Sequence, residues 1–188
     1  MGPLLIVIVL IAIVVFWVVA QYNSLITLRN QVTNGWKQID VQLKRRHDLI
    51  PNLVNTVRGY MEFEQETLEK VINARNAAVS ATGVADAAAK EGALSGALSH
   101  LFALAENYPT LKANENVKQL QEELTSTENK ISFARQFYND IATKFNTAQQ
   151  VFPGNIIAGM FKFQPSELFE IKESSERDVP SVDLSLKK

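Results

Sequence analysis

The first residues of the chain form a continuous apolar run without a polar face. From residue 2 to residue 20 the sequence reads GPLLIVIVLIAIVVFWVVA and carries no charged side chain. About 20 apolar residues at roughly 1.5 Å each match a hydrocarbon core of about 30 Å, so the run predicts a membrane span over Leu4–Ala20. Trp17 and Tyr22 stand near its far end, where amphipathic aromatic rings favour the membrane interface.

A cleaved signal peptide is the alternative interpretation of this segment. Val18 and Ala20 place small side chains where a signal peptidase would cut. However, no Lys or Arg precedes the run, and it is longer than the apolar region of a signal peptide. The sequence therefore favours an uncleaved anchor, and the missing polar face disfavours the core helix of a soluble protein.

Beyond the anchor, apolar residues recur at steps of three and four, which is the period of an amphipathic helix. One such series ends near Leu43, and the next begins between residues 50 and 53. A stretch rich in Ala, Gly and Ser follows. We expect a break near Thr82-Gly83 and then a helix that starts at Asp86, whose carboxylate can cap the first amides.

The last helix has the most regular pattern in the chain. Pro109 should end the preceding helix, and Asn114 can cap the next one. Apolar steps of three and four then continue from Val117 to Phe152, a seven-residue repeat typical of coiled coils. Pro153-Gly154 should end this helix, and the apolar, Gly- and Pro-containing segment after it predicts a short helix and an extended strap.

Four amphipathic helices with short connections predict an all-α fold. We expect an N-terminal transmembrane helix followed by an antiparallel four-helix bundle with long helices. The predicted domains are an anchor over 1–21, a helical bundle over 22–165 and a C-terminal tail over 166–188. The inward-facing seam of the bundle is expected to include Trp36, Leu43, Leu53, Leu120, Leu124, Ile131, Tyr138 and Phe145.

The stretch KRRHDLIPNLV, residues 44–54, predicts a corner between two helices. Asp48 is a favourable N-cap, and Pro51 is tolerated in a first helical turn, where its missing donor costs nothing. Arg45 and Arg46 would then lie in the last turn of the preceding helix, where cations suit the negative end of the dipole. The alternative is that Pro51 only kinks one continuous helix.

Composition points away from several kinds of chemistry. The chain has 19 Lys and Arg against 20 Asp and Glu, so it lacks the basic excess of a nucleic-acid-binding domain. It has no cysteine, and neither His47 nor His100 follows a glutamate by three positions, as a di-metal bundle requires. Phosphate-binding glycine loops and nucleophile elbows are also absent from the sequence. We therefore expect no catalytic, cofactor-binding or metal-binding residues and no enzyme activity.

Three blocks carry a resemblance to a known family: KRRHDLIPNLV, LQEELTSTENKISFAR and FNTAQQVFPGNIIAGMFKF. The chain resembles the LemA family in these blocks, and the resemblance extends from the anchor to about Phe163. It implies a bacterial, membrane-anchored protein with an antiparallel helical bundle and no established enzymatic activity. Related LemA-like domains occur in magnetosome membrane proteins. At Gly35, where alanine is expected in relatives, glycine weakens the helix by about 1 kcal/mol at most.

Two functions remain open. The first is a non-enzymatic, single-pass scaffold or membrane organiser. Its expected partners are the lipid bilayer, further copies of itself and other membrane proteins, and no nucleic acid. The second is an accessory subunit of a membrane protease or phosphatase complex.

The expected location is the bacterial inner membrane. Arg29 and Lys37 after the span favour a cytoplasmic bundle, although an uncleaved signal anchor can also send the following domain across.

Overall fold

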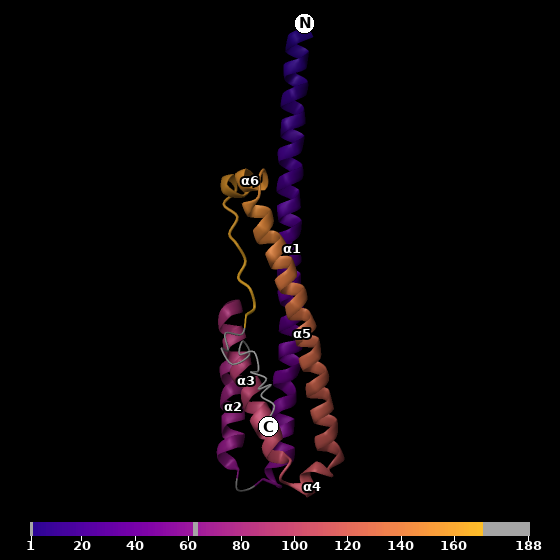
Figure 1. Cartoon of the computed structure of the whole chain (residues 1–188), viewed down its shortest axis with the longest axis vertical. Coiled ribbons are helices and arrows are strands. Elements are labelled where there is room, and N and C mark those ends of the chain that lie inside the picture. The colour runs from indigo at the N-terminus through magenta and orange to yellow at the C-terminus, as the bar shows by residue number, and fades with distance from the viewer. Residues whose placement is uncertain (1, 62–63, 171–188) are drawn as a thin grey trace, which may run out of the picture.

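The computed structural model describes residues 2–61 and 64–170, and these residues form helices and connecting segments without a strand. Figure 1 shows α5 beside α1 over most of its length, and α2 and α3 beside the C-terminal part of α1. The all-α class predicted from the apolar periodicity is therefore confirmed. The helices are α1 (Gly2–Arg58), α2 (Gln65–Val79), α3 (Gly83–Ala105), α4 (Pro109–Lys112), α5 (Glu115–Gln150) and α6 (Gly154–Met160).

Helix α1 carries the apolar N-terminal segment and continues without a break into the packed part of the molecule. It has 57 residues, which correspond to about 85 Å at 1.5 Å per residue. Within the described part of the chain it is the one helix long and apolar enough to cross a membrane. Residues 2–17 are exposed, and Leu25 is the first buried residue of α1.

The corner predicted at Arg45, Arg46, Asp48 and Pro51 is wrong, because α1 passes through all four positions and ends at Arg58. A proline inside a helix removes the donor for the carbonyl four residues earlier, here that of His47. In this structure a residue of α2 replaces that donor. The alternative of a continuous helix through Pro51 is therefore the correct one, and the chain turns between α1 and α2 instead.

The replacement donor is the side chain of Arg75. Its Nε donates to the His47 carbonyl oxygen at 3.1 Å, and Nη1 also donates to Oδ1 of Asn76. Arg75 is a charged residue of α2. The contact shows that its position is set by a carbonyl of α1 that has lost its helical partner.

Two clusters of buried side chains form the core. One joins the C-terminal part of α1 to α2, α3, α4 and the start of α5. The other joins the middle of α1 to α5, α6 and Phe169, with small residues from the start of α3. Of the predicted seam residues, Leu43, Leu53, Leu124, Ile131, Tyr138 and Phe145 are buried, and Trp36 and Leu120 are partly buried.

The helix starts agree in part with the predicted caps. The Asn114 side chain accepts from the amides of Asn116 and Val117 at 3.0 and 3.3 Å, so its predicted cap of α5 is confirmed. Helix α3 begins at Gly83, three residues before the predicted start. Gly83 has φ of +80°, a conformation that glycine adopts readily, and this permits the earlier start.

Asp86 still secures this helix start. Its Oδ2 accepts from the Thr82 amide and from Lys90 Nζ, both at 2.8 Å. These donors, first the Lys90 ammonium and then the Thr82 amide, lower the pKa of the Asp86 carboxyl.

A strap of non-helical chain over residues 163–170 follows α6 and is fixed to α5. Asn146 exchanges two hydrogen bonds with the backbone of Ser166, both at 2.8 Å. Asn139 does the same with Phe169, at 3.1 and 2.8 Å. Because the Phe169 side chain is buried, the predicted boundary between bundle and tail at residue 165 does not match the packing. The rest of the predicted tail, 171–188, lies outside the described residues.

Candidate functional site

A group of polar residues, three of them buried, lies where α1, α3 and α5 meet. We call it the Arg46 cluster, and its members are Arg46, His47, Glu91, Ser95 and Glu128. Arg46 Nη1 lies 3.2 Å from Oε2 of Glu91 and 3.1 Å from Oε2 of Glu128. Its Nη2 donates to Ser95 Oγ at 2.8 Å. One guanidinium therefore binds three side chains on two other helices.

His47 completes the cluster from the next position of α1. Its Nε2 lies 2.6 Å from Oε1 of Glu91, and because a carboxylate only accepts hydrogen bonds, Nε2 is the donating nitrogen. Glu91 thus accepts from Arg46 through one oxygen and from His47 through the other. Both oxygens of this carboxylate are engaged within the protein.

Burial makes these contacts necessary for stability. Arg46 and Glu91 are each 3% exposed, and a buried charge is tolerated only when it is paired and hydrogen-bonded. Glu128 differs, because its side chain remains about half exposed. The cluster therefore holds three helices together with one buried ion pair and one pair at the surface.

The cluster offers little for metal or acid–base chemistry. Among the described residues no three His, Cys, Asp or Glu side chains are close enough to hold a metal ion. The second histidine, His100, lies exposed on α3 and is not part of the cluster. A hollow of about 250 Å³ borders the cluster, but the terminal nitrogens of Arg46, which lines it, already bind Glu91, Glu128 and Ser95. The geometry thus points to a structural role.

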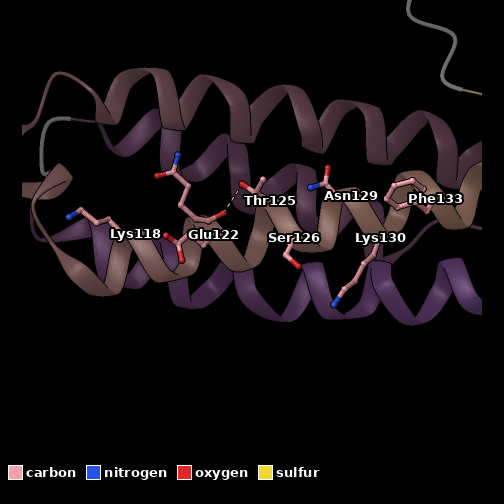
Figure 2. Close-up of a pocket in the computed structure, with 8 residues that line it drawn as sticks. Lys118, Glu122, Thr125, Ser126, Asn129, Lys130 and Phe133 are labelled. Carbon is pink, nitrogen blue, oxygen red and sulfur yellow. Dashed lines mark hydrogen bonds between the residues drawn. The ribbon is translucent and has the colours of Figure 1, made fainter.

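The outer face of α5 presents a second candidate surface. A shallow hollow of about 650 Å³ is lined by α5 alone. Figure 2 shows its side chains in one row along the helix, with Lys118 at one end and Phe133 at the other. Between these ends the row is polar, and Lys130 stands beside Phe133. The lining residues are Lys118, Gln121, Glu122, Thr125, Ser126, Asn129, Lys130 and Phe133.

An exposed apolar patch continues this row onto α1. We call Val41, Phe133 and Phe137 the Phe133 patch; they line a neighbouring hollow of about 620 Å³ between α1 and α5. The exposed fractions are 62% for Val41, 73% for Phe133 and 46% for Phe137. Lys37 and Lys130 also line this hollow. Two aromatic rings and a valine exposed together on two packed helices are typical of an interaction surface.

Comparison with known proteins connects this arrangement to a family. The family model described as LemA family matches residues 35–184. Protein LemA of Metamycoplasma hominis is 30% identical over 178 residues, which cover 93% of this chain and 80% of that protein. The chain belongs to the LemA family. Magnetosome protein MamQ 2 of Paramagnetospirillum magneticum is 23% identical over 190 residues, covering 87% of this chain and 70% of that protein. Magnetosome protein MamQ of Magnetospirillum gryphiswaldense is 22% identical over 185 residues, covering 85% and 68%.

The LemA match begins inside α1 and includes both the Arg46 cluster and the Phe133 patch. At Gly35, the first matched residue, an added Cβ would lie 3.5 Å from Tyr138, which is an ordinary contact. The alanine expected there in LemA relatives would therefore fit this packing.

Sequence reasoning identified one part of these surfaces and missed another. It identified the basic cluster of residues 44–47 but assigned it to a helix end. It missed Glu91 and the Phe133 patch. A single glutamate within the Ala-, Gly- and Leu-rich α3 was the available signal for the first. Phe133 and Phe137, which lie outside the apolar seam of α5, were the signal for the second.

Proposed function

We propose that this LemA-family chain is a non-enzymatic, single-pass membrane protein that acts as a scaffold by associating with further copies of itself. The apolar part of α1 would cross the bacterial inner membrane. Helices α1, α2, α3 and α5 would form an antiparallel four-helix bundle that stands on this anchor, an arrangement supported by their order and short connections. The relatives named as magnetosome proteins support an association with a membrane.

The Phe133 patch is the observation that carries this proposal. The patch lies outside both buried clusters, and its three side chains gain burial only by contact with another molecule. A second copy anchored in the same membrane presents the same patch at the same height above the bilayer. Anchoring in one membrane thus raises the local concentration of the Phe133 patch, and two such apolar patches can pack against each other.

Crosslinking in native membranes tests the proposal. The chain has no cysteine, so Phe133→Cys introduces one defined thiol. We expect rapid disulfide-linked dimers from Phe133→Cys and few from Val79→Cys, a control on α2 whose side chain is also exposed. The double variant Phe133→Asp/Phe137→Asp should abolish oligomers seen with a lysine-reactive crosslinker. A chain that stays monomeric at all concentrations would refute self-association.

Purification of the crosslinked complex distinguishes an accessory subunit from a self-associating scaffold. A stoichiometric protease or phosphatase recovered with the chain, and lost in Phe133→Asp/Phe137→Asp, would favour that function. The polar row on α5 beside the patch is the feature that suits a different protein partner. A complex composed of this chain alone favours the scaffold.

We propose a cytoplasmic bundle, since Arg29 and Lys37 follow the span and basic residues near a span tend to remain in the cytoplasm. Protease added to intact spheroplasts should then leave the bundle undigested. Digestion without lysis would reverse this orientation.

A further inference from the structure

Helix α6 and the turn before it carry a second exposed apolar surface, far from the Phe133 patch along α5. Phe152 is 79% exposed, Ile156 51% and Met160 64%. Ile156 and Met160 are four residues apart and therefore share one face of α6. The opposite face is buried against the bundle through Gly154, Ile157 and Ala158. Helix α6 is thus apolar on both sides, and the protein covers only one of them.

The position of α6 relates this surface to the apolar part of α1. The ring of Phe161, just after α6, lies 4.6 Å from the ring of Tyr22, and the Phe163 ring lies 5.9 Å from it. Tyr22 follows Ala20, the last residue of the apolar run, by about 3 Å of helical rise. Figure 1 shows α6 lying across the end of α5, beside α1 and on the N-terminal side of the packed helices.

Gly154, the first residue of α6, packs closely against the backbone of α5. A Cβ added at Gly154 would clash with the backbone oxygen of Ala148, so the start of α6 lies directly on the last turn of α5. By contrast, a Cβ added at Gly159, in the same short helix, would meet no atom within 4 Å. The first residue of α6 therefore packs on the backbone of α5 with no room for a side chain.

Basic side chains accompany the rings at this level. The Arg29 guanidinium lies over the Phe163 ring, 5.6 Å from its centre, and Lys162 is exposed directly after α6. Aromatic rings with nearby Lys and Arg are the usual composition of the boundary between a bilayer and water. The apolar surface of α6 is also adjacent to the end of the apolar segment of α1, so the same lipid phase can cover both.

We propose that α6 lies in the interface of the bilayer that α1 crosses, with Phe152, Ile156 and Met160 inserted at the boundary of headgroups and acyl chains. This inference rests on the proposed membrane anchoring. The inserted face of α6 attaches the protein to the membrane at a second place, and this fixes the rotation of the packed helices about α1. A helix with one face on protein and the other in lipid needs no further protein partner.

Depth-dependent quenching in proteoliposomes tests the inference with the full chain. Single cysteines replace Ile156, Val7 in the apolar run and Val79 on α2, and each is labelled with an environment-sensitive fluorophore. Val79 is the matched control for Ile156, because the two side chains are 53% and 51% exposed. Neutral phosphatidylcholine vesicles carry nitroxides at shallow or deep positions. We expect shallow nitroxides to quench the label at Ile156 several-fold more than the label at Val79, and deep nitroxides to quench most strongly at Val7.

The outcomes separate the two proposals. No quenching at Val7 would refute the membrane span itself. Quenching at Val7 with Ile156 no more quenched than Val79 would overturn the interfacial position of α6 and leave the span intact. A label at Ile156 that is shielded from lipid quenchers, with disulfide dimers formed by unlabelled Ile156→Cys, would assign the surface to a second copy instead.

Two glycine variants test whether the packing of α6 on α5 determines the depth of the label at residue 156. In the Ile156→Cys background, Gly154→Ala should reduce shallow quenching several-fold, since its Cβ displaces α6 from Ala148. Gly159→Ala should leave the quenching unchanged. Equal quenching in both variants would show that the label enters lipid by itself, which would overturn the inference.

Discussion

The contribution of the Arg46 cluster can be measured by removing the carboxylate at its centre. Glu91→Ala deletes the acceptor of both Arg46 Nη1, at 3.2 Å, and His47 Nε2, at 2.6 Å. Neither group can turn to water, because Arg46 is 3% and His47 9% exposed. The variant therefore leaves a buried cation with only part of its original partners.

The expected magnitude follows from what remains around Arg46. Removing one partner of a buried ion pair costs about 3–5 kcal/mol. Arg46 keeps two of its partners, Glu128 at 3.1 Å and Ser95 at 2.8 Å. We therefore expect a loss near the lower limit, about 3 kcal/mol. For a domain of this size, about 1 kcal/mol shifts the unfolding midpoint by about 2–4 °C, so Glu91→Ala should lower it by roughly 6–12 °C.

Thermal unfolding of the full chain in a mild detergent, followed by far-ultraviolet circular dichroism, provides the measurement. Glu91→Gln keeps the side-chain shape and one acceptor oxygen, so its midpoint should lie between those of the wild type and Glu91→Ala. Glu122→Ala, an exposed position on α5, is the matched control and should change stability by less than about 0.5 kcal/mol. If Glu91→Ala and Glu122→Ala unfold at the same temperature, the buried pair does not stabilise the fold and the reasoning fails.

Two further predictions concern α1 and the start of α3. Arg75→Ala should lower the free energy of unfolding by about 1 kcal/mol, because the His47 carbonyl loses its donor. The loss should be smaller in a Pro51→Ala background, where the amide of residue 51 can donate to the same carbonyl. Asp86→Asn should destabilise the chain at neutral pH but much less in acid. The pKa of Asp86 is lowered in the folded state, so its contribution is present above the ordinary aspartate pKa of about 3.9 and is lost as the pH falls through the folded value.

Each of these predictions has a contradicting result. The effects of Arg75→Ala and Pro51→Ala would be simply additive in a double-mutant cycle if the hydrogen bond contributed nothing. For Asp86, unfolding midpoints of the wild type and Asp86→Asn are compared at pH 7 and at pH 3. A gap between the two that is as large at pH 3 as at pH 7 would show that the ionised carboxylate is not the stabilising group.

Local rules predicted the parts of the fold that local interactions determine. The Asn114 cap depends on amides two and three residues away, and the end of α5 depends on the nearby proline and glycine. The same reasoning failed at Pro51, where the local preference for a helix boundary is real. It was overcome by Arg75, whose contact partner His47 lies 28 residues away in the sequence. A donor brought by another helix cannot be found from periodicity.

The buried cluster shows the same limit for polar residues. Arg46 and His47 read as favourable at a helix end, and nothing adjacent to them indicated burial. Their partner Glu91 lies 45 and 44 residues further on. Likewise, Asn139 and Asn146 of α5 donate to backbone oxygens of the strap that lie 30 and 20 residues away in the sequence. Partners distant in sequence decide whether these polar residues are exposed or buried.

The continuity of α1 restricts how copies of the protein can associate under the proposed anchoring. Val41 lies about 20 residues beyond Ala20, so the Phe133 patch stands roughly 30 Å from the end of the apolar run on a helix without a hinge at that point. Copies inserted with the same orientation in one bilayer are related by rotation about the membrane normal. Pairing of the patch with itself then closes at two copies, because an isologous contact uses the same surface on both.

A ring or larger assembly requires the patch to meet a different surface, such as the polar row of α5 on the neighbouring copy. The number of chains in the detergent-extracted complex therefore identifies which surfaces meet: two chains indicate patch on patch, and a higher cyclic number indicates patch on row.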